Sequence, residues 1–391
     1  MKMRPESESE LAEMIRAADA PLSVVGGGTR VWWRAVDGVD LSTAGLAKLG
    51  LYEPGALTLV AGAGTPVETV EAVLAEKGQR LAFEPPDLRG LLGVTGVSTL
   101  GGVFGANASG PRRVQAGAAR DFLLGVRFVD GTGSVVKNGG RVMKNVTGYD
   151  LVKLMAGSHG TLGVMTEVSL KVLAVPEREA TLVAEGLDTG AALAALRASL
   201  GTPFDVSGAA HDAVTGRTLI RVEGLKGSVD YRAGRLKEAV PGPWSVVTGE
   251  ESAALWRDVR DATVFAGGTA PVWRVSVTPG RAVDLVSALD EAGLAHRALY
   301  DWGGGLIWLE ISGAADGGAA DGGAAVLRAA VDRIGGHATL VRADMGVRAK
   351  VPMFHPQADG VERLSSALRA RFDPRGILNS GLMGRSAMPA S

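Results

Sequence analysis

The sequence contains no cysteine. A chain without thiols forms no disulfide, holds no iron–sulfur cluster through thiolates, attaches no cofactor through a cysteinyl bond and has no cysteine nucleophile. Histidine is scarce as well, because His159, His211, His296, His337 and His355 are the only five and show no H-x-x-x-H spacing. Since clustered carboxylates are also missing, we expect no bound metal.

An excess of charge of either sign is missing too. The 41 basic and 42 acidic residues leave a formal net charge of -1. Nucleic-acid binders need surplus Lys and Arg to neutralise phosphates, so this class of protein is excluded. No apolar run approaches the ~20 residues that span a bilayer. The first residues, MKMRPESESE, are polar and acidic, so we expect no export signal.

Glycine is the residue in excess, at 56 of 391. Three clusters, at 26–29, 101–110 and 159–164, lie beside strand-like runs. Backbone N–H groups can wrap an anion where no Cβ obstructs the approach, and such turns after buried strands bind phosphate or pyrophosphate. Each cluster taken alone also fits a plain turn or close helix packing. The clusters contain neither the G-x-G-x-x-G nicotinamide signature nor a Walker G-K-[ST] loop.

Capping patterns mark two early helices. Ser7 and Glu10 have the spacing of a capping box, which predicts a helix that ends before Pro21. Thr65 is expected to cap a second helix, with Pro66 at its first position and Glu68 closing another capping box.

Strand patterns alternate with these helices. Short apolar or period-2 runs predict strands at 22–25 and 57–61, a hairpin around 126–136, and a strand at 164–172 that follows a helix at 149–156. A last helix from Asp359 carries Val361, Leu364, Leu368 and Phe372 on one face. This alternation indicates an α+β or α/β layered fold.

The composition changes after Pro176, where the chain becomes richer in Ala and Arg. The run AADGGAADGGAA at 314–325 predicts a mobile surface loop. We therefore predict a first domain at 1–175, a second at 176–345, and a C-terminal segment at 346–391 that packs back on the first.

Three stretches, GGGTR at 26–30, STLGG-x-x-GANASG at 98–110 and GYDLVKLMAGSHGTLGVMTEVSLKVL at 148–173, resemble the FAD-binding domain of the vanillyl-alcohol oxidase/PCMH flavoprotein family. The tail FDPRGILNSG at 372–381 is similar to that of the D-lactate and glycolate dehydrogenase branch. The stretch YDWGGG-x-x-W at 300–308 looks like the FAD-binding E subunits of bacterial glycolate oxidases. The resemblance implies an α+β fold with a PCMH-type FAD-binding domain of two α/β subdomains, an α+β cap domain and a returning C-terminal segment.

The same resemblance implies a set of FAD-binding residues. The pyrophosphate would be held by Gly26, Gly27, Gly28 and Thr29, with Ser98, Thr99, Gly101 and Gly102 on its other side. The loop would be closed by Asn107, Ser109 and Gly110. Backbone groups of Gly160, Gly163 and Val164 would contact the cofactor, and Asn379 would lie near the flavin ring. Pro85 and Pro86 match a proline turn before the second glycine loop. No histidine stands at 29 or 30, where some members attach flavin covalently, so non-covalent FAD is implied.

Catalytic members of this branch carry H-x-G-D-G-N-x-x-H and E-H-G-x-G motifs, and this sequence has neither. The stretch near Trp308 offers only Asp301 as a titratable group, so the catalytic residues stay unknown. The resemblance implies a glycolate oxidase complex with a homologous catalytic FAD subunit and an iron–sulfur subunit. The expected location is the cytoplasm. An alternative is a peripheral position at the inner membrane, where partner subunits would hold the complex. The alternatives are a self-sufficient FAD-dependent 2-hydroxyacid or alcohol dehydrogenase, and a scaffold subunit that keeps the flavoprotein fold.

Other residues have structural interpretations beside functional ones. His159 fits either a cofactor contact or a solvated loop, His355 fits a structural turn, and adjacent His211 and Asp212 are not expected to form a dyad. Trp32 and Trp33 are expected in the core. Arg112 and Arg113 are expected to be a solvated pair in preference to binding a phosphate or a carboxylate. Lys144 and Lys153 are expected to be surface charges.

Overall fold

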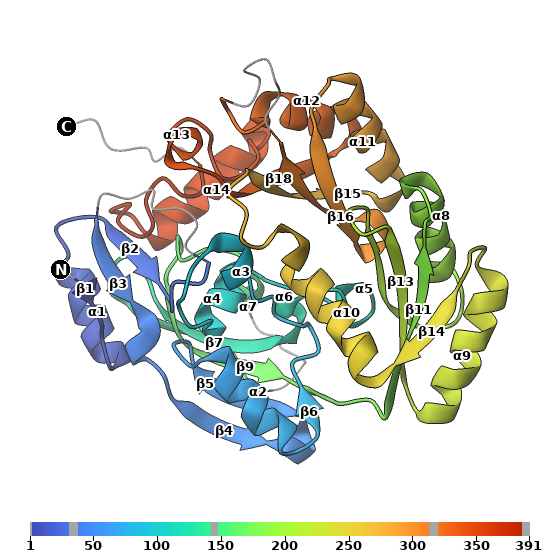
Figure 1. Cartoon of the computed structure of the whole chain (residues 1–391). Helices are drawn as coiled ribbons and strands as arrows, with labels where there is room; N and C mark the ends of the chain where they lie inside the picture. The colour runs from blue at the N-terminus through green and yellow to red at the C-terminus, as the bar shows by residue number, and fades with distance from the viewer. Residues whose placement is uncertain (1, 31–37, 142–147, 313–319, 385–391) are drawn as a thin grey trace.

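The computed structural model describes residues 2–30, 38–141, 148–312 and 320–384. It contains two halves, built around small sheets in the N-terminal part of the chain and one large sheet in the later part (Figure 1). The predicted mixture of helices and strands in an α+β arrangement is confirmed.

A three-stranded parallel sheet begins the chain, with strand order β1-β3-β2. Its elements are β1 (Lys2–Met3), α1 (Glu8–Ala17), β2 (Leu22–Val25) and β3 (Val39–Ser42). Ser7 accepts a hydrogen bond from the Glu10 N–H at 3.2 Å, as predicted. The Glu10 carboxylate bonds the N–H of Glu6 at 2.7 Å instead of returning to Ser7, so the capping box is half formed.

A five-stranded antiparallel sheet follows, with order β4-β5-β9-β7-β8. Its strands are β4 (Leu49–Glu53), β5 (Thr58–Gly62), β7 (Leu123–Val129), β8 (Val135–Gly139) and β9 (Val164–Lys171). Nearby helices are α2 (Val67–Ala75), α3 (Arg89–Leu92), α4 (Leu100–Gly105), α5 (Arg113–Ala116), α6 (Ala119–Phe122) and α7 (Leu151–Met155). The short strands β6 (Gln79–Arg80) and β10 (Leu173–Ala174) pair with each other.

The cap predicted for α2 is wrong. Pro66 occupies the N-cap position and the helix begins at Val67, with no side chain capping it. The Thr65 hydroxyl instead donates to the carbonyl of Lys48 at 3.3 Å. The hydroxyl that the local sequence pattern assigned to the helix N-cap therefore bonds Lys48, a residue of another segment.

The large sheet has eight strands in the order β14-β11-β13-β12-β16-β17-β15-β18. These strands are β11 (Arg178–Glu185), β12 (Val206–Asp212), β13 (Arg217–Gly224), β14 (Ser245–Thr248), β15 (Val272–Val277), β16 (His296–Asp301), β17 (Leu306–Ile311) and β18 (Gly336–Arg342). One face packs on α8 (Thr189–Leu200), α9 (Lys226–Ala239), α11 (Ala282–Glu291) and α12 (Ala324–Ile334). The other face, with α10 (Gly249–Asp261), packs toward α3 of the N-terminal half.

The chain then returns to its beginning through α13 (Met345–Arg348) and α14 (Asp359–Phe372). Leu22 donates to the carbonyl of Ile377 at 2.7 Å, and Asn379 donates back to Leu22 at 3.0 Å. The tail thereby extends the first sheet beside β2. The domain boundaries at 175 and 345 stay a prediction.

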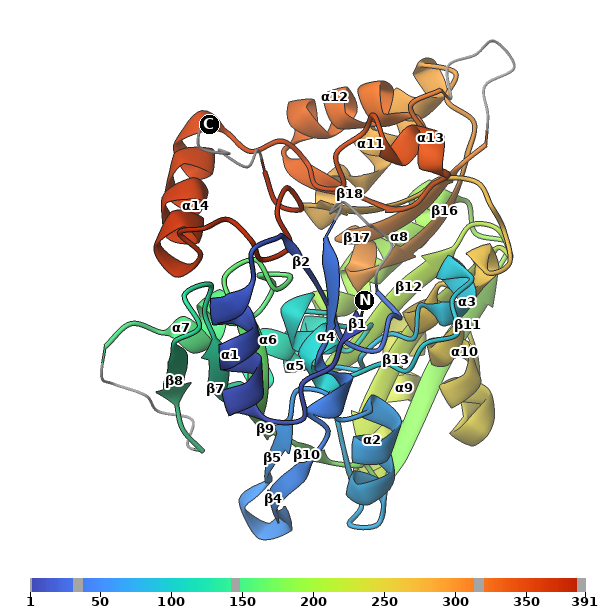
Figure 2. The ribbon, with the colours of Figure 1, turned by 90° about the vertical axis from the view of Figure 1, so that its left-hand side faces the viewer.

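The helix at 359–372 is confirmed, but none of its residues is buried. Val361, Leu364 and Leu368 are exposed, and Figure 2 shows α14 at the edge of the molecule. Only Phe372 reaches a core residue, with its ring 6.1 Å from that of Phe128. The returning segment is anchored by its last strand-like residues and not by the apolar face of the helix.

Candidate functional site

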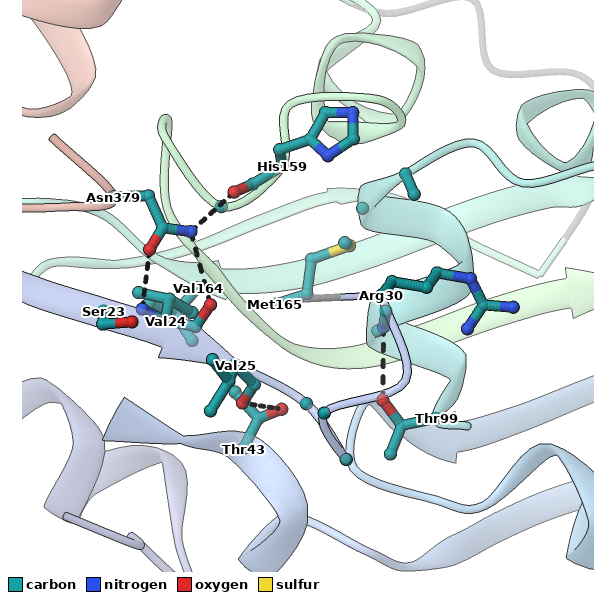
Figure 3. A pocket seen from close by; sticks show the side chains of 18 of the residues that line it. Ser23, Val24, Val25, Arg30, Thr43, Thr99, His159, Val164, Met165 and Asn379 are labelled. Carbon is teal, nitrogen blue, oxygen red and sulfur yellow. Dashed lines mark hydrogen bonds between the residues drawn. The ribbon is translucent and has the colours of Figure 1, made fainter. Parts of the chain in front are cut away.

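A pocket lies where the turn after β2, the start of α4, the turn before β9 and the C-terminal tail meet (Figure 3). It encloses about 970 Å³ of space, a figure that includes open solvent, so the pocket is an open cleft and not a closed cavity. Its lining includes most of the predicted site residues, namely Gly26, Gly27, Gly28, Thr29, Thr99, Gly101, Gly102, Gly160, Gly163, Val164 and Asn379. Segments separated by more than 300 residues therefore share one pocket.

The turn at 26–29 presents its backbone to the pocket. None of its N–H groups bonds a backbone or side-chain acceptor within the described ranges. A Cβ at Gly27 would lie 1.6 Å from the carbonyl oxygen of Val97, so this position admits only glycine. Gly28 has φ +80 and faces open space. Free N–H groups on a bare turn form a site for an anion.

Arg30 is a pocket residue that the sequence reasoning did not assign. Its guanidinium donates to the Ser98 hydroxyl at 2.7 Å and to the carbonyl of Pro86 at 2.6 Å. Burial lowers the pKa of Arg30 to about 10, which leaves it charged at neutral pH. Its Nε is buried without a partner among the described residues. The sequence signal that could have predicted this role is the position of Arg30 directly after a glycine turn, because an arginine there adds a positive charge to an anion site.

The start of α4 forms the second wall. Thr99 caps this helix by accepting from the N–H of Gly102 at 3.3 Å. A Cβ at Gly26 would lie 2.3 Å from the Thr99 hydroxyl, so the two glycine segments approach closely. A Cβ at Gly101 would lie 3.0 Å from Ala63. Gly101 therefore serves helix packing, whereas Gly102 has space on the pocket side.

The turn before β9 forms the third wall, and it contains His159. The His159 N–H donates to the carbonyl of Gly105 at 2.9 Å, and its ring meets Phe354 edge-on at 5.0 Å. Burial lowers the pKa of His159 to about 4. Of the two interpretations of His159, the structure favours the pocket wall over a fully solvated loop, because the neutral side chain lines the pocket and packs on Phe354.

The half-buried imidazole of His159 predicts an acid-sensitive stability. Because the unfolded chain protonates His159 near pH 6.5 and the folded chain only near pH 4, the free energy of unfolding falls as the pH drops through this window. The loss is about 1–3 kcal/mol. His159→Asn, which tolerates the observed φ of +50, is expected to flatten this fall. Denaturant unfolding of both proteins at pH 7 and pH 4.5 measures it, and equal slopes would contradict the assignment.

Asn379 closes the pocket from the tail. Its Oδ1 accepts from the Val24 N–H at 2.7 Å, and its Nδ2 donates to the carbonyls of His159 at 2.7 Å and Val24 at 3.3 Å (Figure 3). The side chain thus links the tail, β2 and the turn at His159. A role beside the flavin ring stays a prediction.

Asn379→Asp is expected to lower stability by about 1–3 kcal/mol, because a carboxylate oxygen would then face two carbonyl oxygens. FAD affinity should fall with it, since the turn and β2 both line the pocket. Asn138→Asp is the matched control, as Asn138 donates to the carbonyl of Tyr149 at 3.1 Å in an exposed setting. Thermal unfolding and FAD titration measure both effects. An equal cost for the two variants would show that Asn379 has no special role.

Four predicted residues do not line the pocket. Ser98 bonds Arg30, while Asn107 and Ser109 accept from the N–H groups of Arg120 and Ala119 at 2.9 and 2.8 Å. A Cβ at Gly110 would lie 2.5 Å from the carbonyl of Glu84. Their hydrogen bonds hold the pocket walls, and their direct contacts with a cofactor stay predictions.

The structure settles several alternatives. His211 is buried, and its Nδ1 lies 3.0 Å from the Thr218 hydroxyl, while Asp212 caps a turn, so no dyad forms. His355 bonds Asp332 at 2.9 Å, which confirms a structural role. Lys153 is partly exposed, as predicted for a surface charge, and its ammonium group donates to the carbonyls of Arg120 and Leu123. Trp32, Trp33, Lys144 and part of the 314–325 run lie outside the described residues.

The solvated arginine pair is the clearest correction. Arg112 is buried and donates to the Glu223 carboxylate at 2.7 and 2.9 Å. Arg113 instead lies over the ring of Trp302, 4.5 Å from its centroid. Sequence alone could not separate two adjacent arginines, because their partners lie far along the chain, Glu223 on β13 and Trp302 in the turn after β16.

Two features are missing from the described ranges. Within them, no cluster of three or more His, Asp or Glu could hold a metal ion. No helix in the same ranges combines the length and apolarity that crossing a membrane requires.

Comparisons with known proteins agree with this geometry. Residues 1–139 match a family model described as an FAD binding domain. The fold resembles that of 4-ethylphenol oxidase from Gulosibacter chungangensis, with a TM-score of 0.71 at 14% identity over 97% of this chain and 88% of that one. The fold and the pocket therefore define an FAD-binding flavoprotein.

Sequence relatives narrow the class. The chain is 33% identical over 366 residues to glycolate oxidase subunit GlcE of Escherichia coli (strain K12), covering 93% of this chain and 92% of that protein. It is 37% identical over 127 residues to glycolate oxidase subunit GlcD of Bacillus subtilis (strain 168), covering 32% of this chain and 26% of that protein. The chain belongs to the vanillyl-alcohol oxidase/PCMH-type family of FAD-dependent oxidoreductases, in the group that contains glycolate oxidase subunit GlcE. This confirms the resemblance noted in the sequence.

Proposed function

We propose that this chain is the FAD-binding subunit of a complex that oxidises glycolate, a 2-hydroxy acid, to glyoxylate. The N–H groups at 26–29, which bond no acceptor among the residues that the structure describes and face an open pocket, carry the proposal. The near full-length similarity to glycolate oxidase subunit GlcE supports the substrate class.

The residues present fit FAD. The N–H groups of Gly26, Gly27 and Gly28 would bind the pyrophosphate, and the Arg30 guanidinium beside them would add charge. Val164 and Met165 would supply an apolar wall for the ring system. When bound, FAD supplies the acceptor for the hydride that leaves the carbon bearing the hydroxyl.

Further subunits complete the proposed complex. The chain has no cysteine to ligate a cluster, so an iron–sulfur centre would be carried by another subunit. It also lacks the histidine motifs of the catalytic branch, which supports a homologous FAD subunit as the place of glycolate oxidation. Purification of the tagged native protein should recover both partners, and recovery of the chain alone would count against the complex.

Reconstitution tests the cofactor directly. Purified chain mixed with FAD should show flavin absorbance and a raised melting temperature, and denaturation should release the flavin because binding is non-covalent. Absence of both absorbance and shift would refute the proposed function. Flavin that stays with the denatured chain would refute non-covalent binding alone.

A second candidate is a self-sufficient dehydrogenase, favoured by Asp301. Burial raises the pKa of this carboxyl to about 7, a suitable value for a general base, but Asp301 is not among the residues that line the pocket, so the substrate would have to reach it from outside the pocket. Asp301 ends β16 and accepts from the Trp302 N–H at 2.7 Å. Anaerobic mixing of the FAD-loaded chain with glycolate or D-lactate separates the candidates, since rapid flavin bleaching by the lone chain would favour the second.

A further inference from the structure

The segment at 84–92 belongs to the N-terminal part of the chain, but the half built around the large sheet holds it. The N–H of Asp87 donates to the carboxylate of Asp261, the last residue of α10, at 2.7 Å. The carbonyl of Leu91 accepts from the guanidinium of Arg342 on β18 at 2.9 Å. Figure 1 shows α3, which ends this segment, beside α10. Contacts with the large-sheet half therefore set the position of the segment.

The same segment also reaches the FAD pocket. The carbonyl of Pro86 accepts from the Arg30 guanidinium at 2.6 Å. Arg30 lines the pocket, and its other terminal nitrogen donates to the Ser98 hydroxyl at 2.7 Å, next to the start of α4 (Figure 3). A residue of the segment thus holds one of the side chains that would face the cofactor.

One peptide group joins these two contacts. The carbonyl of Pro86 and the N–H of Asp87 belong to the same peptide unit, which is trans and planar, so the two groups point to opposite sides. Arg30 bonds one side of this unit and Asp261 bonds the other. A rotation that breaks one hydrogen bond therefore misdirects the other, and hydrogen bonds in such a chain also strengthen one another.

The position of Asp261 at the end of a helix has a cost that this contact explains. A carboxylate in the last turn of a helix faces the negative end of the helix dipole, which lowers the stability of the helix. Arg260 offsets part of this cost by donating twice to the same carboxylate, each time at 2.8 Å. Asp258 in the same turn is exposed, and its carboxylate accepts only from the local Thr263 hydroxyl, at 2.8 Å. Of these two acids, Asp261 is the one that bonds the pocket-bearing half.

Arg30 keeps donors for a ligand after these bonds are made. Its Nε is buried and has no partner among the described residues. Burial lowers the pKa of Arg30 to about 10, and the charges of Asp87 and Asp261 oppose this shift, so the guanidinium stays charged at neutral pH. A guanidinium that is already held in one direction loses less side-chain entropy when it binds an anion than a mobile one does.

We propose that Asp261 is a positioning residue for the FAD pocket, which acts through the peptide unit between Pro86 and Asp87 to direct the Arg30 guanidinium toward the site of the pyrophosphate. Asp261 does not itself line the pocket. The large-sheet half would thereby contribute to FAD affinity from outside the pocket. This inference rests on the proposed binding of the FAD pyrophosphate at the turn 26–29.

A double-mutant cycle on the full chain, freed of flavin and titrated with FAD by fluorescence, tests this role. Arg30→Gln is expected to weaken FAD binding at least about tenfold, as for the loss of a charge-assisted hydrogen bond. Asp261→Ala is expected to weaken it about fivefold, because the two residues are coupled. In the Arg30→Gln background, Asp261→Ala should cause no further loss, since the side chain that it positions is gone. Losses that multiply in the double variant would overturn the proposal, because a merely structural role predicts them.

Two single variants separate position from charge and from helix stability. Asp261→Asn should keep most of the FAD affinity, because its amide oxygen can still accept from the Asp87 N–H. An Asn variant as weak as Asp261→Ala would show that charge and not position matters, and would overturn the positioning role. Asp258→Ala is the matched control in the same turn of α10, and it should bind FAD like the unchanged protein.

The remaining outcomes distinguish this inference from the proposed function. If Asp261→Ala binds FAD as tightly as the unchanged protein, or if Asp258→Ala weakens FAD binding equally, the positioning role fails although the pocket still binds FAD. If the unchanged chain binds no FAD, the proposed function fails and the positioning role fails with it. Melting temperatures of all variants, recorded without FAD, show whether each variant is folded before it is titrated.

Discussion

Gly102→Trp is expected to abolish FAD binding while leaving the protein folded. Gly102 lines the pocket, and its nearest neighbours to an added Cβ are the Thr99 hydroxyl at 3.3 Å and the Arg30 guanidinium at 3.9 Å. The position lies within α4, where a side chain costs no helical stability relative to glycine. An indole there would occupy the space between α4 and the turn at 26–29. We expect affinity for FAD to fall by more than about a hundredfold, which equals about 2.7 kcal/mol.

The matched control is Gly55→Trp. Gly55 has open space around an added Cβ and lies on the exposed 3-10 turn between β4 and β5. This variant should bind FAD like the unchanged protein, as measured by flavin absorbance after gel filtration. If Gly102→Trp also retains flavin, the pocket is not the FAD site.

The same variant separates an electron-carrying role from a scaffold role. If FAD of this subunit lies on the electron path, the complex containing Gly102→Trp should lose glycolate turnover although it still assembles. Full turnover with no flavin in this subunit would support the scaffold alternative. Flavin content per subunit and turnover must therefore be measured on the same preparation.

Arg221→Met is expected to give the largest loss of stability. Arg221 of β13 is 1% exposed and donates to the Glu84 carboxylate at 2.9 and 3.0 Å. Arg112 lies 3.0 Å from Glu84 and also bonds Glu223, and Arg80 bonds Glu223 at 2.6 Å. This buried network joins the N-terminal half to the large sheet. Removing Arg221 leaves carboxylates short of a partner, and the expected cost is about 3–5 kcal/mol.

The network also predicts a pH dependence. Burial raises the pKa of Glu84, but the charges of Arg221 and Arg112 outweigh burial and hold that pKa below its ordinary value. The stabilisation is therefore present above about pH 4.5 and is lost as the pH falls through the folded-state pKa. In Arg221→Met this acid-dependent loss should shrink, because the charge that lowered the pKa is gone.

Arg217→Met on the same strand is the control for the network. Arg217 lies 3.3 Å from Glu185 in an exposed ion pair, which contributes at most about 1 kcal/mol. Denaturant unfolding of the two variants compares a buried charge with an exposed one on one strand. A cost for Arg221→Met as small as that for Arg217→Met would show that the network does not hold the two halves together.

Local structure was largely predictable. The strand at 22–25 agrees with β2, the hairpin agrees with β7 and β8, and the last helix begins at Asp359 as predicted. These patterns depend on neighbouring residues only, since alternation, turn residues and helix starts are local properties. Errors arose where a distant group competed, as when the Thr65 hydroxyl bonded Lys48 instead of capping a helix.

Glycine clusters were informative for the same reason. Gly27 must be glycine because Val97 of another segment leaves no space for a Cβ, and Gly28 has the positive φ that glycine adopts at low cost. These steric and conformational requirements are visible in the sequence, because only glycine meets them at such positions. Arginine and histidine leave no comparable trace, because the same residue can be solvated, paired or buried.

The sequence by itself determined which short segments turn, extend or coil, and which bare turns can approach an anion. Only the tertiary structure decided that Arg112 is neutralised by Glu223 while Arg113 lies over Trp302, and that His159 is half-buried in the pocket wall. The free energy of a charge depends on its distance to other charges and on its depth from water. Neither quantity exists until segments hundreds of residues apart have packed together.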